Sequence, residues 1–173
     1  TAGTGGFGLK RDSLASYSPY IQWVITAFMI LFGVNFNLYY LMLLKKFKAV
    51  VTSTELWAYF GIILSSAALI AWNIRHLFGG LEQTVRTAAF QVASVISTTG
   101  YATADFNLWP NFSKNILFIL MFIGGCAGST AGGIKVSRIV LLFKLISNEV
   151  KRMLHPRSVS SLRFEGKTVD GHT

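Results

Sequence analysis

The chain has 173 residues, of which 52% are hydrophobic and only 13% charged, and its mean hydropathy is +0.50. This composition excludes an ordinary soluble domain and indicates that a lipid bilayer is the solvent. The net charge of +9 would suit nucleic acid, but the basic residues flank long apolar runs, which is typical of membrane topology signals and predicts no nucleic-acid partner. The single cysteine, Cys126, excludes an internal disulfide framework, and its apolar neighbours in the sequence favour an inert thiol.

Three apolar runs are long enough to cross a hydrocarbon core of about 30 Å as helices. The first covers residues 20–44, begins after a proline and ends at a lysine cluster that we place on the cytoplasmic side. The second covers residues 56–75 and returns to the outside, with Trp57 and Trp72 near its ends as interfacial anchors. The third covers residues 112–147, which is too long for one simple crossing.

A short apolar stretch between the second and third runs, residues 84–96, can be buried but cannot cross a bilayer. It leads into the polar, glycine-containing residues 97–101. Irregular backbone at membrane depth occurs only inside protein or beside water, so this arrangement predicts a re-entrant segment that lines a cavity. Basic residues after the first and third runs place those ends in the cytoplasm, and the re-entrant segment therefore enters from the outside.

Four residues of this loop, Thr98, Thr99, Gly100 and Tyr101, have the chemistry of a cation filter. A dehydrated cation needs a ring of oxygen dipoles, which the backbone carbonyls of an extended loop can supply. Glycine permits the positive φ that aims successive carbonyls at one axis, and threonine hydroxyls can add ligands at the inner mouth. The short helix before the loop would direct its negative C-terminal end at the ion. An ordinary turn is an equally good interpretation of these four residues by themselves.

The N-terminal residues repeat the pattern of this loop. Thr4, Gly5, Gly6 and Phe7 are followed by an aspartate and then by a proline at the start of the first apolar run. The loop at residues 98–101 is likewise followed by an aspartate and by a proline at the start of the third run. The recurrence indicates pseudo-symmetric repeats, each of which contributes one loop to a shared filter.

A family resemblance is carried by residues 86–92 leading into 97–101, by residues 124–135 and by the pair His155-Pro156. These segments resemble the Trk/Ktr/HKT superfamily of potassium transporters, and within it the TrkH branch most closely. The resemblance extends over nearly the whole chain, with one departure at Tyr101, where the superfamily often has phenylalanine. It implies an all-α membrane protein built from potassium-channel-like repeats of an outer helix, a re-entrant pore helix with its filter loop, and an inner helix.

The resemblance also implies a role for each part of the chain. Because neither end has the features of a natural terminus, we expect an internal part of a longer protein. The implied order is the end of a second-repeat filter and an extracellular loop at 1–19, the second inner helix at 20–44, a cytoplasmic loop at 45–55, the third outer helix at 56–75, the pore helix and filter at 84–101, the third inner helix at 112–147, broken by a gate loop at 124–133, and a cytoplasmic connector at 148–173.

The glycine-rich part of the third run supports two interpretations. Gly124, Gly128 and Gly132 recur every four residues, which is typical of close packing between transmembrane helices, and the sequence alone favours this reading. Each glycine would also cost a helix about 1 kcal/mol, and the excess length of the run indicates a break. The resemblance favours the break, as a gate beneath the filter. The implied gate loop comprises Gly124, Gly125, Cys126, Ala127, Gly128, Ser129, Thr130, Ala131, Gly132, Gly133 and Lys135.

Polar side chains within the apolar runs have simpler interpretations. Lys135 either places a positive charge near the ion path or, with Arg138, extends to the cytoplasmic interface. Asn35 is predicted to form a hydrogen bond between helices. Arg86 is predicted to pair with a buried acid or carbonyl, and Glu82 is a candidate partner.

The sequence therefore predicts potassium movement across a cell membrane, a bacterial inner membrane by the resemblance, through backbone carbonyls gated by the glycine loop, with the potassium ion at the filter residues and no covalently bound cofactor. The resemblance implies a homodimer embedded in membrane lipid and a cytoplasmic nucleotide-binding regulatory subunit of the TrkA/KtrA kind.

A nucleotide-hydrolysing enzyme is excluded because Ile134 interrupts the phosphate-loop pattern and Val136 stands where that pattern needs a hydroxyl. The alternative is a non-conducting structural subunit that packs through its glycines. Alternation over residues 161–169 predicts a short cytoplasmic hairpin.

Overall fold

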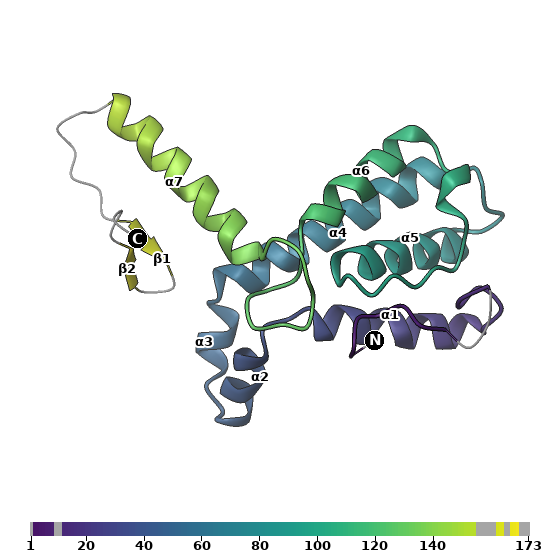
Figure 1. Cartoon of the computed structure of the whole chain (residues 1–173), viewed down its shortest axis with the longest axis horizontal. Helices are drawn as coiled ribbons and strands as arrows, with labels where there is room; N and C mark the ends of the chain where they lie inside the picture. Colours follow the sequence, from purple (N-terminus) through teal and green to yellow (C-terminus); the bar gives the residue numbers. More distant parts are fainter. Residues whose placement is uncertain (1, 9–11, 155–161, 165–166, 170–173) are drawn as a thin grey trace.

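Helices make up almost all of the structure, a computed structural model that describes residues 2–8, 12–154, 162–164 and 167–169. The predicted motif at His155-Pro156 and parts of the expected connector lie outside the described residues. Figure 1 shows a body of packed helices from which one long helix, α7 (Val136–Leu154), projects.

The first apolar run folds as two helices at a right angle. α1 (Pro19–Phe32) begins with a proline in its first turn, after a serine whose hydroxyl caps the helix. α2 (Phe36–Leu43) is bent by 90° from α1. The prediction of a single helix over residues 20–44 is therefore wrong.

The break between α1 and α2 has a local cause. Gly33 lies against the hydroxyl of the buried Tyr59 so closely that a β-carbon would not fit. Asn35 Oδ1 accepts a hydrogen bond from the Asn37 backbone N–H at 2.9 Å and so caps the start of α2. Asparagine favours this position because its side chain replaces a backbone partner at a helix start. Asn35 is thus an N-cap, not the interhelical contact that the sequence suggested.

A single uninterrupted helix of membrane length follows. The expected loop at residues 45–55 contains a short helix, α3 (Phe47–Val51), and it ends early because α4 (Thr54–Ile74) begins inside it. α4 has 21 residues and is about 30 Å long, the thickness of a hydrocarbon core. Of the helices in the described part of the chain, α4 alone is long and apolar enough to cross a membrane, and α1 with α2 makes a second span if the bent pair counts as one.

The next helix, α5 (Leu81–Ile96), is short and lies between α1 and α4 (Figure 1). Its Ala88 and Val92 recur every four residues on one face and are fully buried in the main core. The same core contains Ile63 and Ile70 of α4. Packing on two sides explains how a helix too short to cross a bilayer is held within the protein.

The third apolar run is interrupted in its middle. A 3-10 turn, η1 (Phe106–Leu108), precedes α6 (Asn111–Phe122), which packs on α4 and α5. The helix ends at its twelfth residue, and residues 123–135 form an irregular loop before α7 begins. The interpretation of the glycines as one continuous packing helix is therefore wrong, because the backbone leaves the helix there.

The C-terminal part starts later than expected. α7 continues to Leu154, so the first residues of the expected connector at 148–173 are helical. β1 (Leu162–Phe164) pairs antiparallel with β2 (Lys167–Val169), within the segment whose alternation predicts a hairpin.

Candidate functional site

The loop that follows α5 has a backbone of alternating handedness. Thr98 has φ +53° and Gly100 has φ +83°, whereas Thr99 between them keeps a negative φ. A β-branched residue at positive φ is a genuine outlier, and such strain gathers at functional sites. Alternation of this kind turns successive carbonyls toward the same side of the chain, which is the arrangement a line of cation ligands requires.

Hydrogen bonds hold this loop in place. The Ser94 hydroxyl donates to the Tyr101 carbonyl at 2.6 Å, and the Ser94 carbonyl accepts from the backbone N–H groups of Thr99 at 2.9 Å and Gly100 at 3.3 Å. The Thr99 hydroxyl shares a hydrogen bond of 2.7 Å with Ser97 and is buried. Its side chain therefore has a protein partner within the loop.

The N-terminal loop has the same backbone pattern at the matching positions. Thr4 has φ +45° and Gly6 has φ +65°, with a negative φ at Gly5 between them. Thr4 and Gly6 are thus in the left-handed region, as Thr98 and Gly100 are at the matching positions of the other loop. Two segments that are 94 residues apart in the sequence therefore share the same alternation in the sign of φ.

The two loops lie side by side. A β-carbon added at Gly6 would approach the Thr99 carbonyl oxygen to 2.6 Å, so the glycine permits close contact of the backbones. The Tyr101 hydroxyl donates to the Phe7 carbonyl at 3.3 Å. Further along, the Ala102 carbonyl accepts from the backbone N–H of Leu14 at 3.1 Å. The repeat seen in the sequence is therefore a pair of adjacent structural units.

The irregular segment at residues 123–135 is a closed loop with a narrow neck. Gly124 N–H donates to the Ile134 carbonyl at 2.9 Å, and Ile134 N–H donates to the Phe122 carbonyl at 3.0 Å. A β-carbon at Gly124 would collide with the Gly132 backbone across the neck. Gly128 has a positive φ of +68° at the far end of the loop. We call this segment the intramembrane loop.

The intramembrane loop fills the break between α1 and α2. Cys126 N–H donates to the Gly33 carbonyl at 2.9 Å, and Thr130 N–H donates to the Phe32 carbonyl at 3.3 Å. In return, the Gly128 carbonyl accepts from the first N–H of α2 at 3.2 Å. Two interruptions of helical backbone inside the protein would each leave polar groups unsatisfied, and here each satisfies the other.

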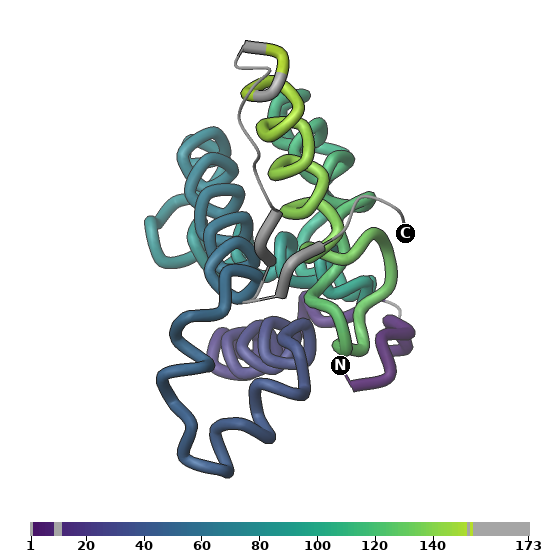
Figure 2. Tube along the Cα trace, turned by 90° about the vertical axis from the view of Figure 1, so that its left-hand side faces the viewer, coloured from purple at the N-terminus to yellow at the C-terminus, as the bar shows by residue number. Residues whose placement is uncertain are grey.

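The intramembrane loop also contacts both glycine loops. The Thr98 hydroxyl accepts from the Gly132 N–H at 2.8 Å, and the Thr4 hydroxyl donates to the Thr130 carbonyl at 3.5 Å. Figure 2 shows the N-terminal segment beside the intramembrane loop. The Lys135 ammonium donates to a carbonyl within the same loop, that of Ala131, so in this structure it turns back onto the loop.

Sequence reasoning missed Glu55, a buried acid that touches the intramembrane loop. Its side chain is 3% exposed, and its Oε1 accepts from the backbone N–H of Ala127 at 2.7 Å and of Ser137 at 3.2 Å. The available signal was one carboxylate at the start of a long apolar run. An acid is common in the first turn of a helix, because it interacts favourably with the helix dipole. The sequence therefore gives no reason to expect that Glu55 also contacts a distant loop.

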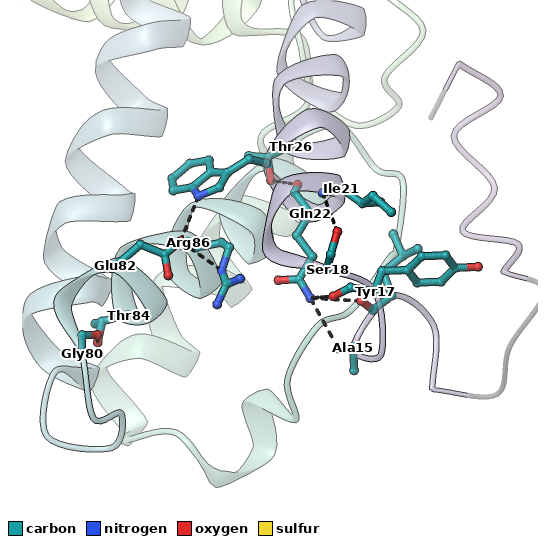
Figure 3. Close-up of polar contacts among 12 residues, drawn as sticks. Ala15, Tyr17, Ser18, Ile21, Gln22, Thr26, Gly80, Glu82, Thr84 and Arg86 are labelled. Carbon is teal, nitrogen blue, oxygen red and sulfur yellow. Dashed lines mark hydrogen bonds and ion pairs between the residues drawn. The ribbon is translucent and has the colours of Figure 1, made fainter.

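On the outer side of α1, polar contacts attach α1 to α5 and to the preceding loop. Glu82, the candidate partner of Arg86, does pair with it, with 3.5 Å between Nε and Oε1, but its side chain is exposed and is not the buried acid that was predicted. Glu82 also accepts from the Trp23 indole N–H at 3.1 Å. Figure 3 shows these side chains and the Gln22 amide, which donates to carbonyls of the loop before α1, among them that of Leu14 at 3.2 Å.

The fold defines the class of helical membrane proteins with re-entrant segments. Its features are apolar helices, a bent helix pair that can count as one span, and loops that fold back into the protein. The profile of the TrkH family, described as cation transport proteins, matches residues 42–172, and the chain belongs to this family.

Similar proteins support this assignment. The chain is 33% identical over 174 residues to the Trk system potassium uptake protein TrkH of Escherichia coli K12, covering 98% of this chain and 36% of that protein. It is 31% identical over 172 residues to the Trk system potassium uptake protein TrkG of the same organism, with 98% and 36% covered. The crystal structure of the potassium transporter TrkH from Vibrio parahaemolyticus superposes with a TM-score of 0.89 at 30% identity, over 97% of this chain and 37% of that one. The chain thus spans about 36% of the length of the curated relatives it matches.

Proposed function

We propose that this chain forms part of a potassium pore, with the carbonyls of residues 98–101 and 4–7 as two quarters of a selectivity filter. The observation that carries the proposal is the pair of adjacent loops with the same alternation of φ, at Thr4 and Gly6 in one and at Thr98 and Gly100 in the other. Potassium is the transported ion, and the relatives are potassium uptake proteins by name.

The proposed repeats follow from this assignment. α4 is the outer helix of one repeat, α5 its pore helix, and α6 with α7 its inner helix, while α1 with α2 is the inner helix of the repeat before it. The C-terminal end of α5 leads directly into the filter loop, and the partial negative charge of that end favours a cation. We expect all of these helices to lie in a cell membrane, and specifically in a bacterial inner membrane.

We assign the gate to the intramembrane loop. It contacts the threonine of each filter loop, so it lies at one end of the proposed ion path. Its hydrogen bonds to the α1 carbonyls hold it there, and we take the described conformation to be the closed one. Opening would require the loop to leave Thr98 and the break between α1 and α2.

The remaining parts of the proposal concern partners. We expect the complete protein to form a homodimer and to bind a cytoplasmic nucleotide-binding regulatory subunit. The relatives are named as components of a Trk system, which agrees with such an assembly.

The test is potassium uptake by a transport-deficient cell that expresses the complete protein. Gly100→Ser should lower the preference for potassium over sodium, because Gly100 has a positive φ that serine adopts only with strain. Deletion of residues 128–132 should raise the flux, because it removes the gate and leaves the filter. If both variants keep the selectivity and flux of the parent, the chain is a non-conducting subunit that packs through its glycines, and the proposal is wrong.

A further inference from the structure

Glu55 is the one acid that the structure places against the intramembrane loop among the described residues. Its carboxylate oxygen accepts from Ala127 at 2.7 Å, in the middle of the loop, and from Ser137 at 3.2 Å, in the first turn of α7. Glu55 itself belongs to the first turn of α4. One carboxylate therefore joins three elements, α4, the intramembrane loop and α7.

The surroundings suit a negative side chain. The first turns of α4 and of α7 both carry backbone N–H groups that have no carbonyl partner inside the regular helix, and both present the positive end of a helix dipole. Glu55 belongs to the first turn of α4 and accepts a hydrogen bond from the first turn of α7, and its side chain is almost fully buried. A buried ionisable residue in a membrane helix is costly and is retained for a functional reason.

The hydrogen bonds that Glu55 accepts are the strongest of those that join the loop to neighbouring elements. The other contacts of the loop with α1 and with the filter threonines are neutral hydrogen bonds. Hydrogen bonds to a carboxylate are roughly twice as strong as neutral ones. Losing Glu55 should therefore loosen the loop more than losing any other single side-chain contact between the loop and a neighbouring element.

We propose that Glu55 is a latch, a positioning residue that keeps the intramembrane loop closed and ties its release to the N-terminal end of α7. Because one oxygen holds both Ala127 and Ser137, a shift of the start of α7 changes the geometry of the bond to the loop. The inference rests on the proposed gate for its functional meaning, but the latch itself is a statement about the loop and can be tested without any flux.

Cys126 supplies the test, because it follows the neck of the loop and is fully buried in the closed conformation. The complete protein would be purified in detergent as Glu55→Gln, Glu55→Ala and the control Glu82→Gln. A maleimide would be added, and its reaction at Cys126 followed with time by mass spectrometry of that peptide. Glutamine keeps the size of the side chain and a neutral acceptor, so it reports on the charge, and it decides the result if the alanine variant does not fold.

The expected result is a rate of Cys126 modification at least about tenfold above the parent for Glu55→Ala, equivalent to about 1.4 kcal/mol in the opening equilibrium. Glu55→Gln should fall between the parent and Glu55→Ala. Glu82→Gln should match the parent, because Glu82 is exposed in the first turn of α5, at the opposite end of that helix from Thr98 and the loop that contacts it. An unchanged rate in a folded Glu55→Gln variant overturns the latch.

Potassium flux in liposomes, measured on the same variants, separates this inference from the proposed function. Faster modification with raised flux supports both. Faster modification with unchanged flux keeps the latch but shows that the loop is not the gate. Unchanged modification with potassium-selective flux in the parent overturns the latch and leaves the proposed pore standing.

Discussion

Alanine substitution at the three glycines of the two filter loops should damage selectivity to different degrees. The order expected from the structure is Gly6 worst, then Gly100, then Gly5. These glycines differ in two properties that alanine would change, the sign of φ and the space for a β-carbon. The N-terminal loop thus holds both the most and the least sensitive position.

The magnitudes follow from these two properties. Gly100 has φ +83°, and its added β-carbon would meet only the Gly6 Cα at 3.9 Å, so the cost is that of left-handed backbone, about 1–2 kcal/mol. That is a factor of about 5–30 in the population of the native loop. Gly6 adds a contact of 2.6 Å with the Thr99 carbonyl oxygen, one of the proposed ligands, which must move. Gly5 has a negative φ, and its β-carbon meets only the exposed Phe7 ring, which can rotate away.

The assay is the ratio of potassium to sodium uptake in a transport-deficient cell, with each variant normalised to the amount of protein in the membrane. Gly6→Ala should lose most or all of its selectivity, Gly100→Ala part of it, and Gly5→Ala little. Equal effects at all three positions, or a larger effect at Gly5 than at Gly6, would refute the reasoning from backbone geometry.

Three further predictions concern the gate and the packing around it. Gly128→Ala should raise potassium flux, because Gly128 has φ +68° and a β-carbon there would lie 3.1 Å from Asn35 Oδ1, the oxygen that caps α2. The control is Gly132→Ala, which should show the potassium flux of the parent, because Gly132 has no positive φ and its β-carbon would have its nearest contact at 3.5 Å. Tyr59→Phe should lower stability by about 1 kcal/mol in thermal unfolding, because the buried hydroxyl donates to a carbonyl of α1 at 3.1 Å. Trp23→Phe should cost less than about 1 kcal/mol in the same measurement, because its partner Glu82 is exposed.

The sequence predicted the elements whose signals are local. The apolar length of α4 and the proline that starts α1 are properties of a few consecutive residues, and these two helices begin within two residues of the expected positions. The repeated threonine-glycine pattern at residues 4–7 and 98–101 was also visible, because a backbone with positive φ leaves glycine in the sequence. The filter role of these residues stays a prediction.

The parts that sequence reasoning missed depend on contacts between distant segments. The break at Gly33 was hidden because one glycine in an apolar run costs a helix only about 1 kcal/mol, and what requires it is Tyr59, on another helix. Glu55 was missed for the same reason, since its partners are 72 and 82 residues away in the chain. The helix is interrupted near Gly33 and again at residues 123–135, and the two interruptions supply hydrogen-bond partners to each other. The sequence does not show this contact, because the two segments are far apart in the chain.

The central claim is that backbone carbonyls of residues 4–7 and 98–101 coordinate potassium. Anomalous diffraction from crystals of the complete protein grown in rubidium, a heavier ion of similar size, tests it most directly. We expect rubidium peaks at coordination distance from these carbonyls, between the two loops and next to the intramembrane loop. Rubidium bound elsewhere in the protein, with none beside these carbonyls, would contradict it.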